Sequence, residues 1–350
     1  MRRLARMRKP ALAIVVGTAV VVLGGQAAWG CGGLVAPNGA VRLIKTTTLA
    51  TYHNGVEHYL TSFQFQGFGT QFGSIVPLPG VPTNVSKGGS WTLQRLEREV
   101  SPPIFDTHAP LAASPGRSAE VLLQTKVDAL DITVLKGGGH AVVDWVRAHG
   151  FAVSTDAPSV LDFYARRSPI FLAARYDPAA ALSRGLGTGD GTPVQVSIPI
   201  ANPWVPLRIL ALGKDTEDVV QADVFLLTDH RPSILTGPGV RLARSETAPA
   251  QLLDDLRADK NMGWVPRSGW FSYLKVQTPS ATLRYDMAID ASGAGQPSTV
   301  AAGLSTTDRL ARLLPSDGLT AWDWTGIAIV AAGLAVALGL VRRRNRAFSY

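Results

Sequence analysis

The sequence predicts an α+β protein: a strand-rich, largely antiparallel extracytoplasmic body with a few short helices, plus one C-terminal transmembrane helix. Three observations predict this class. Strand-like segments of the body follow one another without regularly intervening helices, which is typical of antiparallel sheets. The chain begins with basic residues and an apolar stretch, as an export signal does. A second apolar stretch near the C-terminus ends in a run of arginines.

Residues 1–30 are predicted to be a signal peptide. Five basic residues precede the apolar run 11–24, and the small-residue segment 25–30 follows it, which is the order of a secretory signal. Cleavage after Gly30 would make Cys31 the first residue of the mature chain. The sequence leaves three fates open for Cys31: lipidation, a free or intermolecularly paired thiol, or an inert side chain.

The C-terminal apolar stretch predicts a transmembrane helix over residues 324–341. From Thr325 to Val341 no residue is charged, and this length is within the about 17 to 25 residues that span a hydrocarbon core. Aromatic side chains mark one boundary and arginines the other: Trp322, Trp324, Arg342, Arg343, Arg344 and Arg346. This arrangement predicts a single-pass membrane protein whose body is extracytoplasmic and whose basic tail, 342–350, is cytoplasmic.

The same helix predicts the lipid bilayer as a partner. Ala331, Ala335 and Gly339 lie four residues apart on it, so weak homo-association through close helix contact is a further expectation. A simple Ala and Gly bias explains the spacing equally well. Residues 291–323, rich in Ser, Gly, Ala and Thr, are expected to form a stalk between body and helix.

The charge of the chain is concentrated at its ends. The chain has 34 Lys and Arg against 26 Asp and Glu, and the leader and the tail hold nine of the basic residues. The remainder is close to neutral, so a nucleic-acid partner is not expected. A single cysteine excludes an internal disulfide, and the body, residues 31–290, must depend on its hydrophobic core.

Turn signals and hydrophobic alternation divide the body into short elements, with Asn54-Gly55 as the strongest hairpin signal. The predicted strands are 41–53 and 56–66, 74–76, 121–136, 169–175, 193–200, 205–213, 219–228, and a hairpin-like pair at 269–277 and 281–290. The predicted helices are 90–100 with Ser90 as N-cap, 141–149, 160–166 and 249–260. A Gly- and Ala-rich segment near 178–192 is a candidate subdomain boundary.

Several of these stretches together resemble a known family. They are "CGGLVAPNGAV", "TTTLATYHNGVEHYLTSFQFQG", "FGSIVPLPGVPTNV" followed by "GGSWTLQRL", and the later "WVRAHGF" and "NPWVPLRILAL". The chain resembles the exported bacterial family called domain of unknown function 2330 (DUF2330). The resemblance implies an exported bacterial protein with a signal peptide and often a C-terminal membrane helix. It implies no activity and no catalytic residue.

The stretch "YHNGVEHY" places two of the six histidines beside a glutamate. A hairpin centred on Asn54-Gly55 pairs His53 with Val56 and Tyr52 with Glu57, so His53 and His58 share one face and Glu57 lies on the other. A compact His-Glu-His site is therefore excluded, and a metal would need a third ligand from elsewhere, such as Asp106 or His108. The histidine face, which also carries polar side chains, is expected to be half exposed.

Other motifs predict structure rather than chemistry. The glycines before His140 resemble a phosphate-binding turn but lack the P-loop lysine, so a plain turn is preferred. Asp229 and His230 lie at the end of a strand without an accompanying nucleophile motif, which favours a polar turn. No cofactor is expected.

The sequence thus predicts a membrane-anchored protein of the bacterial cell envelope. We favour a non-catalytic module that binds an unidentified envelope protein or ligand. The alternative is an exported metal-dependent hydrolase that uses His53 and His58 as metal ligands.

Overall fold

The computed structural model of the chain describes residues 33–35, 42–66, 72–100, 120–177, 180, 183 and 192–304. Over these residues the protein is strand-rich and mostly antiparallel with four short α-helices, which confirms the α+β class. Within this part of the chain, no helix is long and apolar enough to cross a membrane. The predicted signal peptide, Cys31 and the predicted membrane helix with its flanking Trp and Arg residues lie outside the described residues.

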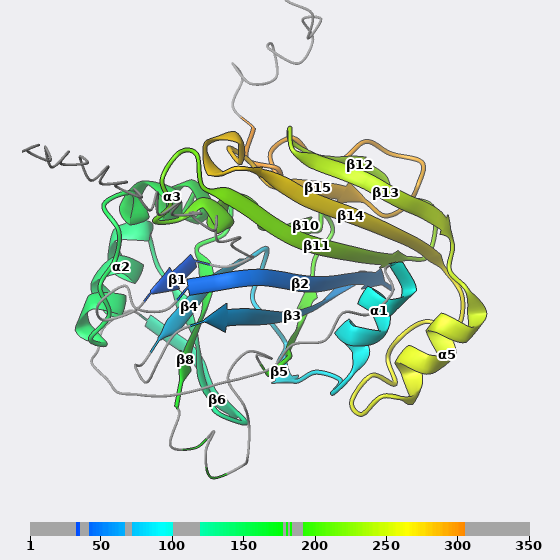
Figure 1. The fold of residues 1–350 in the computed structure, drawn as a ribbon, viewed down its shortest axis with the longest axis horizontal. Coiled ribbons are helices and arrows are strands. Elements are labelled where there is room, and N and C mark those ends of the chain that lie inside the picture. The colour runs from blue at the N-terminus through cyan, green and yellow to red at the C-terminus, as the bar shows by residue number, and fades with distance from the viewer. Residues whose placement is uncertain are drawn as a thin grey trace, which may run out of the picture.

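A seven-stranded sheet forms the centre of the body (Figure 1). Strands β2 and β11 pair in parallel, and all other neighbours in this sheet are antiparallel. In the order β13-β14-β11-β2-β3-β9-β5, the strands span Val240–Thr247, Trp270–Pro279, Val219–Thr228, Arg42–His53, Val56–Gln66, Val194–Pro199 and Asn84–Lys87. Strands from before and after the segment 178–192 therefore share one sheet.

Two smaller antiparallel sheets accompany it. The five-stranded sheet has the order β1-β4-β8-β7-β6, with strands Gly33–Val35, Gly73–Leu78, Ile170–Tyr176, Leu130–Lys136 and Glu120–Val127. The three-stranded sheet has the order β10-β15-β12, with strands Trp204–Val205, Met287–Asp290 and Ser233–Leu235. The predicted single strand 121–136 is in fact a hairpin, because Asp128 adopts a left-handed φ of 51° and reverses the chain.

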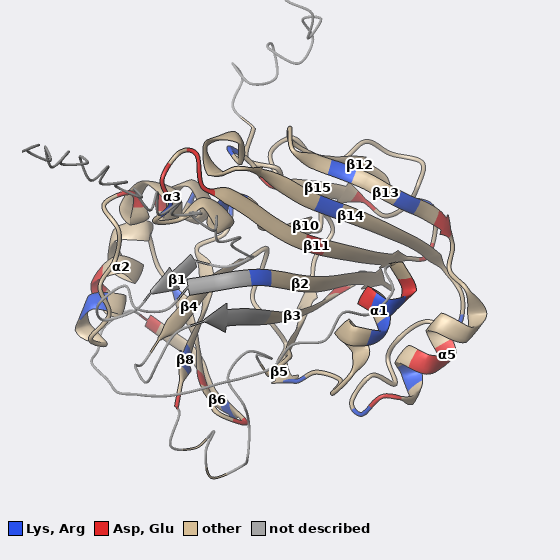
Figure 2. Cartoon of the chain, viewed as in Figure 1, with Lys and Arg blue, Asp and Glu red and all other residues tan. Residues whose placement is uncertain are grey.

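All four predicted helices are present, with ends that differ by three residues or fewer. They are α1 (Thr92–Val100), α2 (Gly139–Ala148), α3 (Ala157–Ala165) and α5 (Ala250–Ala258), and two short 3₁₀ helices are η1 (Arg208–Ala211) and η2 (Ser280–Thr282). Figure 1 shows α1 and α5 together at one side of the body and α2 with α3 at the other. Acidic and basic side chains are interspersed on α1 and α5 (Figure 2).

Both faces of the seven-stranded sheet are covered. On the face that carries His58, Leu49 and Leu60 are fully buried in one core cluster with Leu96 of α1 and Leu256 of α5. The expectation that this face is half exposed therefore holds for Lys45, His53, His58 and Ser62, which are partly exposed, but not for the centre of the face. Two helices far apart in the sequence meet over it, which strand alternation alone does not reveal.

Two polar residues of this face, Lys45 and Thr47, are bound to α1. The Lys45 ammonium group lies 2.9 Å from a Glu97 carboxylate oxygen and 2.6 Å from one of Asp223. The Thr47 hydroxyl donates a 2.5 Å hydrogen bond to Glu97, and Tyr273 donates one of 2.7 Å to Asp223. A buried polar group is tolerated when it is paired in this way.

The N-terminus of α1 is capped by a distant residue rather than by Ser90. The backbone amides of Ser90 and Trp91 and the Thr92 hydroxyl all donate to the Asp259 carboxylate, at 3.1, 2.9 and 2.8 Å. A Cβ on Gly89 would lie 2.3 Å from that carboxylate, so only glycine allows this approach. The motif "GGSWTLQRL" therefore joins α1 to the end of α5.

Two strand predictions around the second half of the body are wrong. Segment 205–213 forms η1 after two residues of strand, because the amides of Leu207 and Arg208 donate to the Asp286 carboxylate instead of to a strand. Segments 269–277 and 281–290 do not pair with each other: β14 lies between β11 and β13, and β15 lies in the three-stranded sheet. Competing partners distant in the chain decide both cases.

Strand β4, Gly73–Leu78, is longer than the predicted strand 74–76. Pro77 lies within it, opposite Phe171 of β8. On the other side, β1 pairs only with residues 73–75 of β4, so Pro77 lies where that edge of the strand has no β1 partner and needs no amide hydrogen. The loop after Leu78 then carries the chain from the five-stranded sheet to β5 in the seven-stranded sheet.

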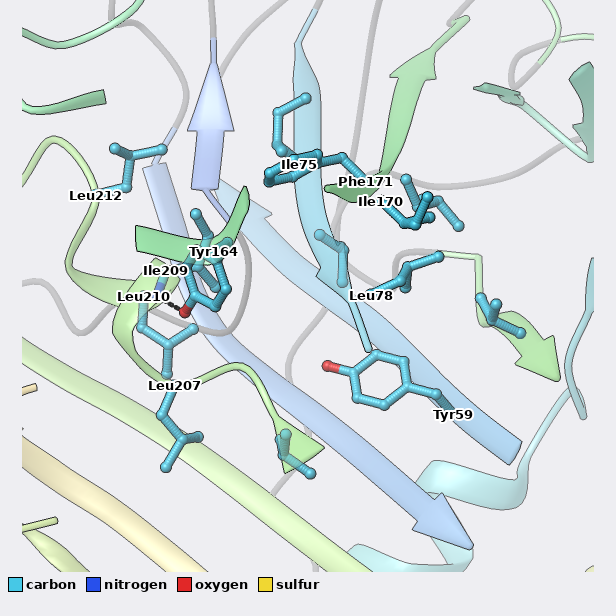
Figure 3. Close-up of a cluster of buried hydrophobic side chains, with 14 of the residues drawn as sticks. Tyr59, Ile75, Leu78, Tyr164, Ile170, Phe171, Leu207, Ile209, Leu210 and Leu212 are labelled. Atoms are coloured by element: carbon cyan, nitrogen blue, oxygen red, sulfur yellow. Dashed lines mark hydrogen bonds between the residues drawn. The ribbon is translucent and has the colours of Figure 1, made fainter. Parts of the chain in front are cut away.

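The larger core cluster lies between the two big sheets and extends under α2 and α3. Tyr59 of β3 and Leu78 of β4 contribute to it from the two sheets, and Tyr164 contributes from α3 (Figure 3). The Tyr164 hydroxyl accepts a 2.8 Å hydrogen bond from the Ile209 amide. Burial beside Asp286 raises the pKa of Tyr164 well above its usual value.

A buried ionic cluster around Asp286 ties the C-terminal part of the body to α3. The fully buried Asp286 carboxylate is paired with Arg167 and accepts a 2.8 Å hydrogen bond from Tyr164. The Arg167 guanidinium also donates to the Ala301 carbonyl at 2.8 Å, and Ala302 is fully buried. The body therefore extends through residue 304, beyond the expected start of the stalk at residue 291.

Candidate functional site

The hairpin end of β2 and β3 has the register that the sequence predicts. Asn54 and Gly55 have φ of 51° and 77°, as both central residues of a type I′ turn require. Tyr52 pairs with Glu57 and His53 with Val56. The two histidines therefore lie on one face of the hairpin and Glu57 lies on the other, as predicted.

His53 is bound by a side chain from another strand. Strand β11 runs parallel to β2 with Thr228 opposite Tyr52. Asp229, which follows Thr228, therefore lies beside His53, which follows Tyr52. One Asp229 carboxylate oxygen lies 2.5 Å from His53 Nδ1, and the Asn54 side-chain amide lies 2.8 Å from His53 Nε2. With the amide nitrogen donating to Nε2, Nδ1–H donates to Asp229. Both ring nitrogens of His53 are thereby engaged.

Asp229 does not pair with its neighbour His230. The Thr228 hydroxyl donates a 2.7 Å hydrogen bond to the His230 carbonyl, which closes the polar turn that the sequence predicted. Asp229 instead contacts His53 on the adjacent strand, which no local motif shows.

His58 lies between a hydroxyl and an indole. Its Nδ1 is 3.0 Å from the Ser197 hydroxyl of β9, and its ring stacks on Trp264 with centroids 4.2 Å apart and planes 12° from parallel. Burial, with a smaller contribution from His53, lowers the pKa of His58 to about 4. The imidazole is therefore neutral near pH 7 and a weak base there. We define the hairpin-end site as His53, His58, Ser197, Asp229 and Trp264.

On the opposite face of the hairpin, Glu57 is a buried acid without a hydrogen bond. It is 1 % exposed, and neither carboxyl oxygen has a partner among the described residues. Burial raises the pKa of Glu57 from 4.5 to about 8. The neighbouring Tyr52 hydroxyl donates instead to the Ile200 carbonyl at 2.8 Å. Glu57 is therefore predominantly neutral near pH 7.

The sequence identified three of the five site residues and missed Ser197 and Trp264. Ser197 could have been found only by knowing that β9 pairs with β3, since it lies directly opposite His58. Trp264 follows α5, in the loop that leads to β14, and has no sequence signal beyond its aromatic ring.

The hairpin-end site does not contain a set of metal ligands in the part of the chain that the structure describes. No set of three or more His, Cys, Asp or Glu side chains there could hold a metal ion. Asp106 and His108, considered as third ligands, lie outside the described residues.

The glycine turn before α2 binds a carboxylate of the protein itself, that of Asp162. The Gly139 amide donates a 2.7 Å hydrogen bond to the Asp162 carboxylate of α3, and His140 lies 3.6 Å from the same carboxylate. A Cβ on Gly139 would lie 2.4 Å from the Asp162 amide nitrogen. These glycines therefore serve close helix packing.

Comparison with known proteins identifies the family. The family model described as "Uncharacterized protein conserved in bacteria (DUF2330)" matches residues 25–235. This is more than half of the chain, so the chain belongs to the DUF2330 family, as the sequence motifs predict. The matched range includes four of the five site residues; Trp264 lies beyond it.

No curated protein matches this chain. Among solved structures, the crystal structure of baculovirus P35 is similar with a TM-score of 0.38 and 9 % sequence identity, over 72 % of this chain and 97 % of that one. That TM-score is too low for the likeness to inform the fold or the function.

Proposed function

We propose that the chain is an exported, single-pass protein of the bacterial cell envelope whose body binds a partner or ligand without carrying out chemistry. The membrane placement is supported by the order of basic, apolar and small residues at the N-terminus and by the apolar segment 324–341 with its arginine tail. The family description, which is of a protein conserved in bacteria, agrees with a bacterial setting.

The binding role is supported chiefly by the way in which the groups of the hairpin-end site are divided. A Ser-His-Asp triad requires one histidine that contacts both the hydroxyl and an orienting carboxylate. Here Ser197 contacts His58, whereas Asp229 contacts His53. A histidine with a pKa of about 4 is also a poor general base near neutral pH. A half-buried indole stacked on a neutral imidazole, beside a hydroxyl and a carboxylate, is suited to recognition.

Membrane placement is tested by protease accessibility in intact cells and in inside-out vesicles, with epitope tags inserted after residue 296 and at the C-terminus. We expect the internal tag to be cleaved in intact cells and the C-terminal tag only in inside-out vesicles. A control chain that ends at residue 323 should leave the membrane fraction. A C-terminal tag cleaved in intact cells would contradict the proposed orientation.

The distinction from a metal-dependent hydrolase is tested by the metal content of the detergent-purified full chain. We expect no stoichiometric transition metal in the wild type or in the His53→Ala, His58→Ala double variant. The matched control is His140→Ala, His149→Ala, which removes two histidines away from the hairpin end. One equivalent of zinc that only the first double variant loses would overturn the binding proposal.

A further inference from the structure

Glu57 occupies a position at which a change of charge would act directly on the hairpin-end site. It lies in β3 between Tyr52 of β2 and Ile198 of β9. The next residue along β3 is His58, which contacts Ser197 of β9. The residue after β9 is Ile200, whose carbonyl accepts a hydrogen bond from the Tyr52 hydroxyl. Glu57 thus borders the β3–β9 seam on one face while the site lies on the other.

The titratable groups around Glu57 offer it no counter-charge. Tyr52, on the same face, is a neutral phenol whose pKa is raised by burial and then by the negative charges of Glu57, Asp229 and Asp290. The facing residue on β9 is the fully buried Ile198. The histidines project to the opposite face of the sheet. An ionised Glu57 would therefore have neither a hydrogen bond nor a cation among the described residues.

We propose that Glu57 is a pH-sensitive switch of the hairpin end: its neutral acid is compatible with a closed β3–β9 seam, and its carboxylate opens that seam and separates His58 from Ser197. An isolated carboxylate in an apolar interior carries a large desolvation penalty, which opening of the seam relieves by admitting water. Opening breaks the pairing of residues 56–58 with residues 197–199 at the hairpin end and leaves the remaining pairs of the seam in place.

The direction of the effect follows from the raised pKa of Glu57, about 8 when the seam is closed and 4.5 when the carboxyl is in water. Below 4.5 the acid is neutral in both states, so pH has no effect. Between 4.5 and 8 only the open state releases its proton, and the equilibrium constant for opening rises about tenfold per pH unit. Above 8 both states are ionised and the effect is complete. The use of this switch to regulate ligand binding rests on the proposed function. The opening of the β3–β9 seam does not depend on it.

Hydrogen exchange of the full chain in detergent micelles, read by mass spectrometry between pH 5 and 9, tests the switch. Protection factors, which already remove the intrinsic pH dependence of exchange, are compared for peptides covering 52–60 and 194–200 and for α2 as a reference. We expect the first two peptides to be less protected than α2 and to lose about tenfold in protection per pH unit up to pH 8.

Glu57→Gln, which keeps the shape and removes the charge, should abolish this pH dependence. Glu217→Gln, at an exposed glutamate, should retain it. The proposal is overturned if Glu57→Gln behaves as the wild type does, if the wild type shows no pH dependence, or if the two seam peptides are as well protected as α2 at every pH, because their exchange would then be global unfolding. None of these results bears on membrane placement or on metal content.

Discussion

Two buried carboxylates have opposite surroundings in this protein. Asp286 is fully buried, is paired with Arg167, and accepts hydrogen bonds from Tyr164 and from two backbone amides at the start of η1. Glu57 is equally buried and has no hydrogen-bond partner in the described part of the chain. The first carboxylate holds elements together as an ion, whereas the second is accommodated only as a neutral acid.

The difference distinguishes a buried carboxylate that stabilises the fold from one whose burial is energetically unfavourable. The partners of Asp286 come from α3 and η1, and the same Arg167 reaches residue 301, so the cluster joins segments far apart in the chain. Glu57 lies at the end of a hairpin, next to half-exposed polar side chains. When an ionisable side chain is buried without a partner next to a candidate site, a functional reason for its position is expected.

Asp286→Ala is expected to have the largest effect. Removal of the carboxylate leaves the Arg167 guanidinium buried without its counter-charge, which costs about 3 to 5 kcal/mol of the free energy of unfolding. Urea unfolding of the purified chain measures this loss, with Asp144→Ala on the exposed surface of α2 as the control. A loss as small as that of the control would show that Asp286 does not hold α3 and η1 together.

Glu57→Gln is expected to have the opposite sign. At pH 7 the wild type loses about 3 kcal/mol because the unfolded chain ionises Glu57 and the folded chain does not, and the variant avoids this loss. Below pH 4.5 the carboxyl is neutral in both states, so wild type and variant should converge. Unfolding free energies at pH 4, 7 and 8.5 measure the difference; a variant less stable than the wild type at pH 7 would mean that Glu57 has an unrecognised partner.

Asp259→Ala tests whether a third buried carboxylate behaves like Asp286. It is 4 % exposed and accepts three hydrogen bonds at the start of α1, so we expect a loss of about 1 to 2 kcal/mol. Ser90→Ala is the matched control and should leave stability unchanged, because the Ser90 backbone and not its side chain is bound. The reverse ranking of the two variants in thermal unfolding would restore Ser90 as the cap.

His53→Gln is expected to have the smallest effect. His53 and Asp229 side chains are 33 % and 36 % exposed, and a solvent-screened pair of this kind contributes about 0.5 kcal/mol or less. Thermal unfolding at low and high salt measures it. A loss comparable to that of Asp259→Ala would show that the hairpin-end site is part of the structural framework rather than a surface for recognition.

Much of the local structure was predictable from the sequence. Asn54-Gly55 determines the turn and, through it, the register that divides the histidines from Glu57, because both residues must adopt positive φ. The four helices follow from hydrophobic spacing and from stop signals such as Gly150, whose φ is 81°. The family also follows from local motifs.

The sequence by itself therefore determined the short-range features: the hairpin, the helices, the family and the two candidate histidines. Only the tertiary structure decided that the histidine face is covered by α1 and α5, that Asp229 reaches His53, and that His58 meets Ser197 and Trp264. It also decided that η1 replaces a strand at Asp286. The physical reason is that pairing between distant strands, and competition for buried hydrogen bonds, depend on which segments meet in space, whereas turns and helix ends depend on a few consecutive residues.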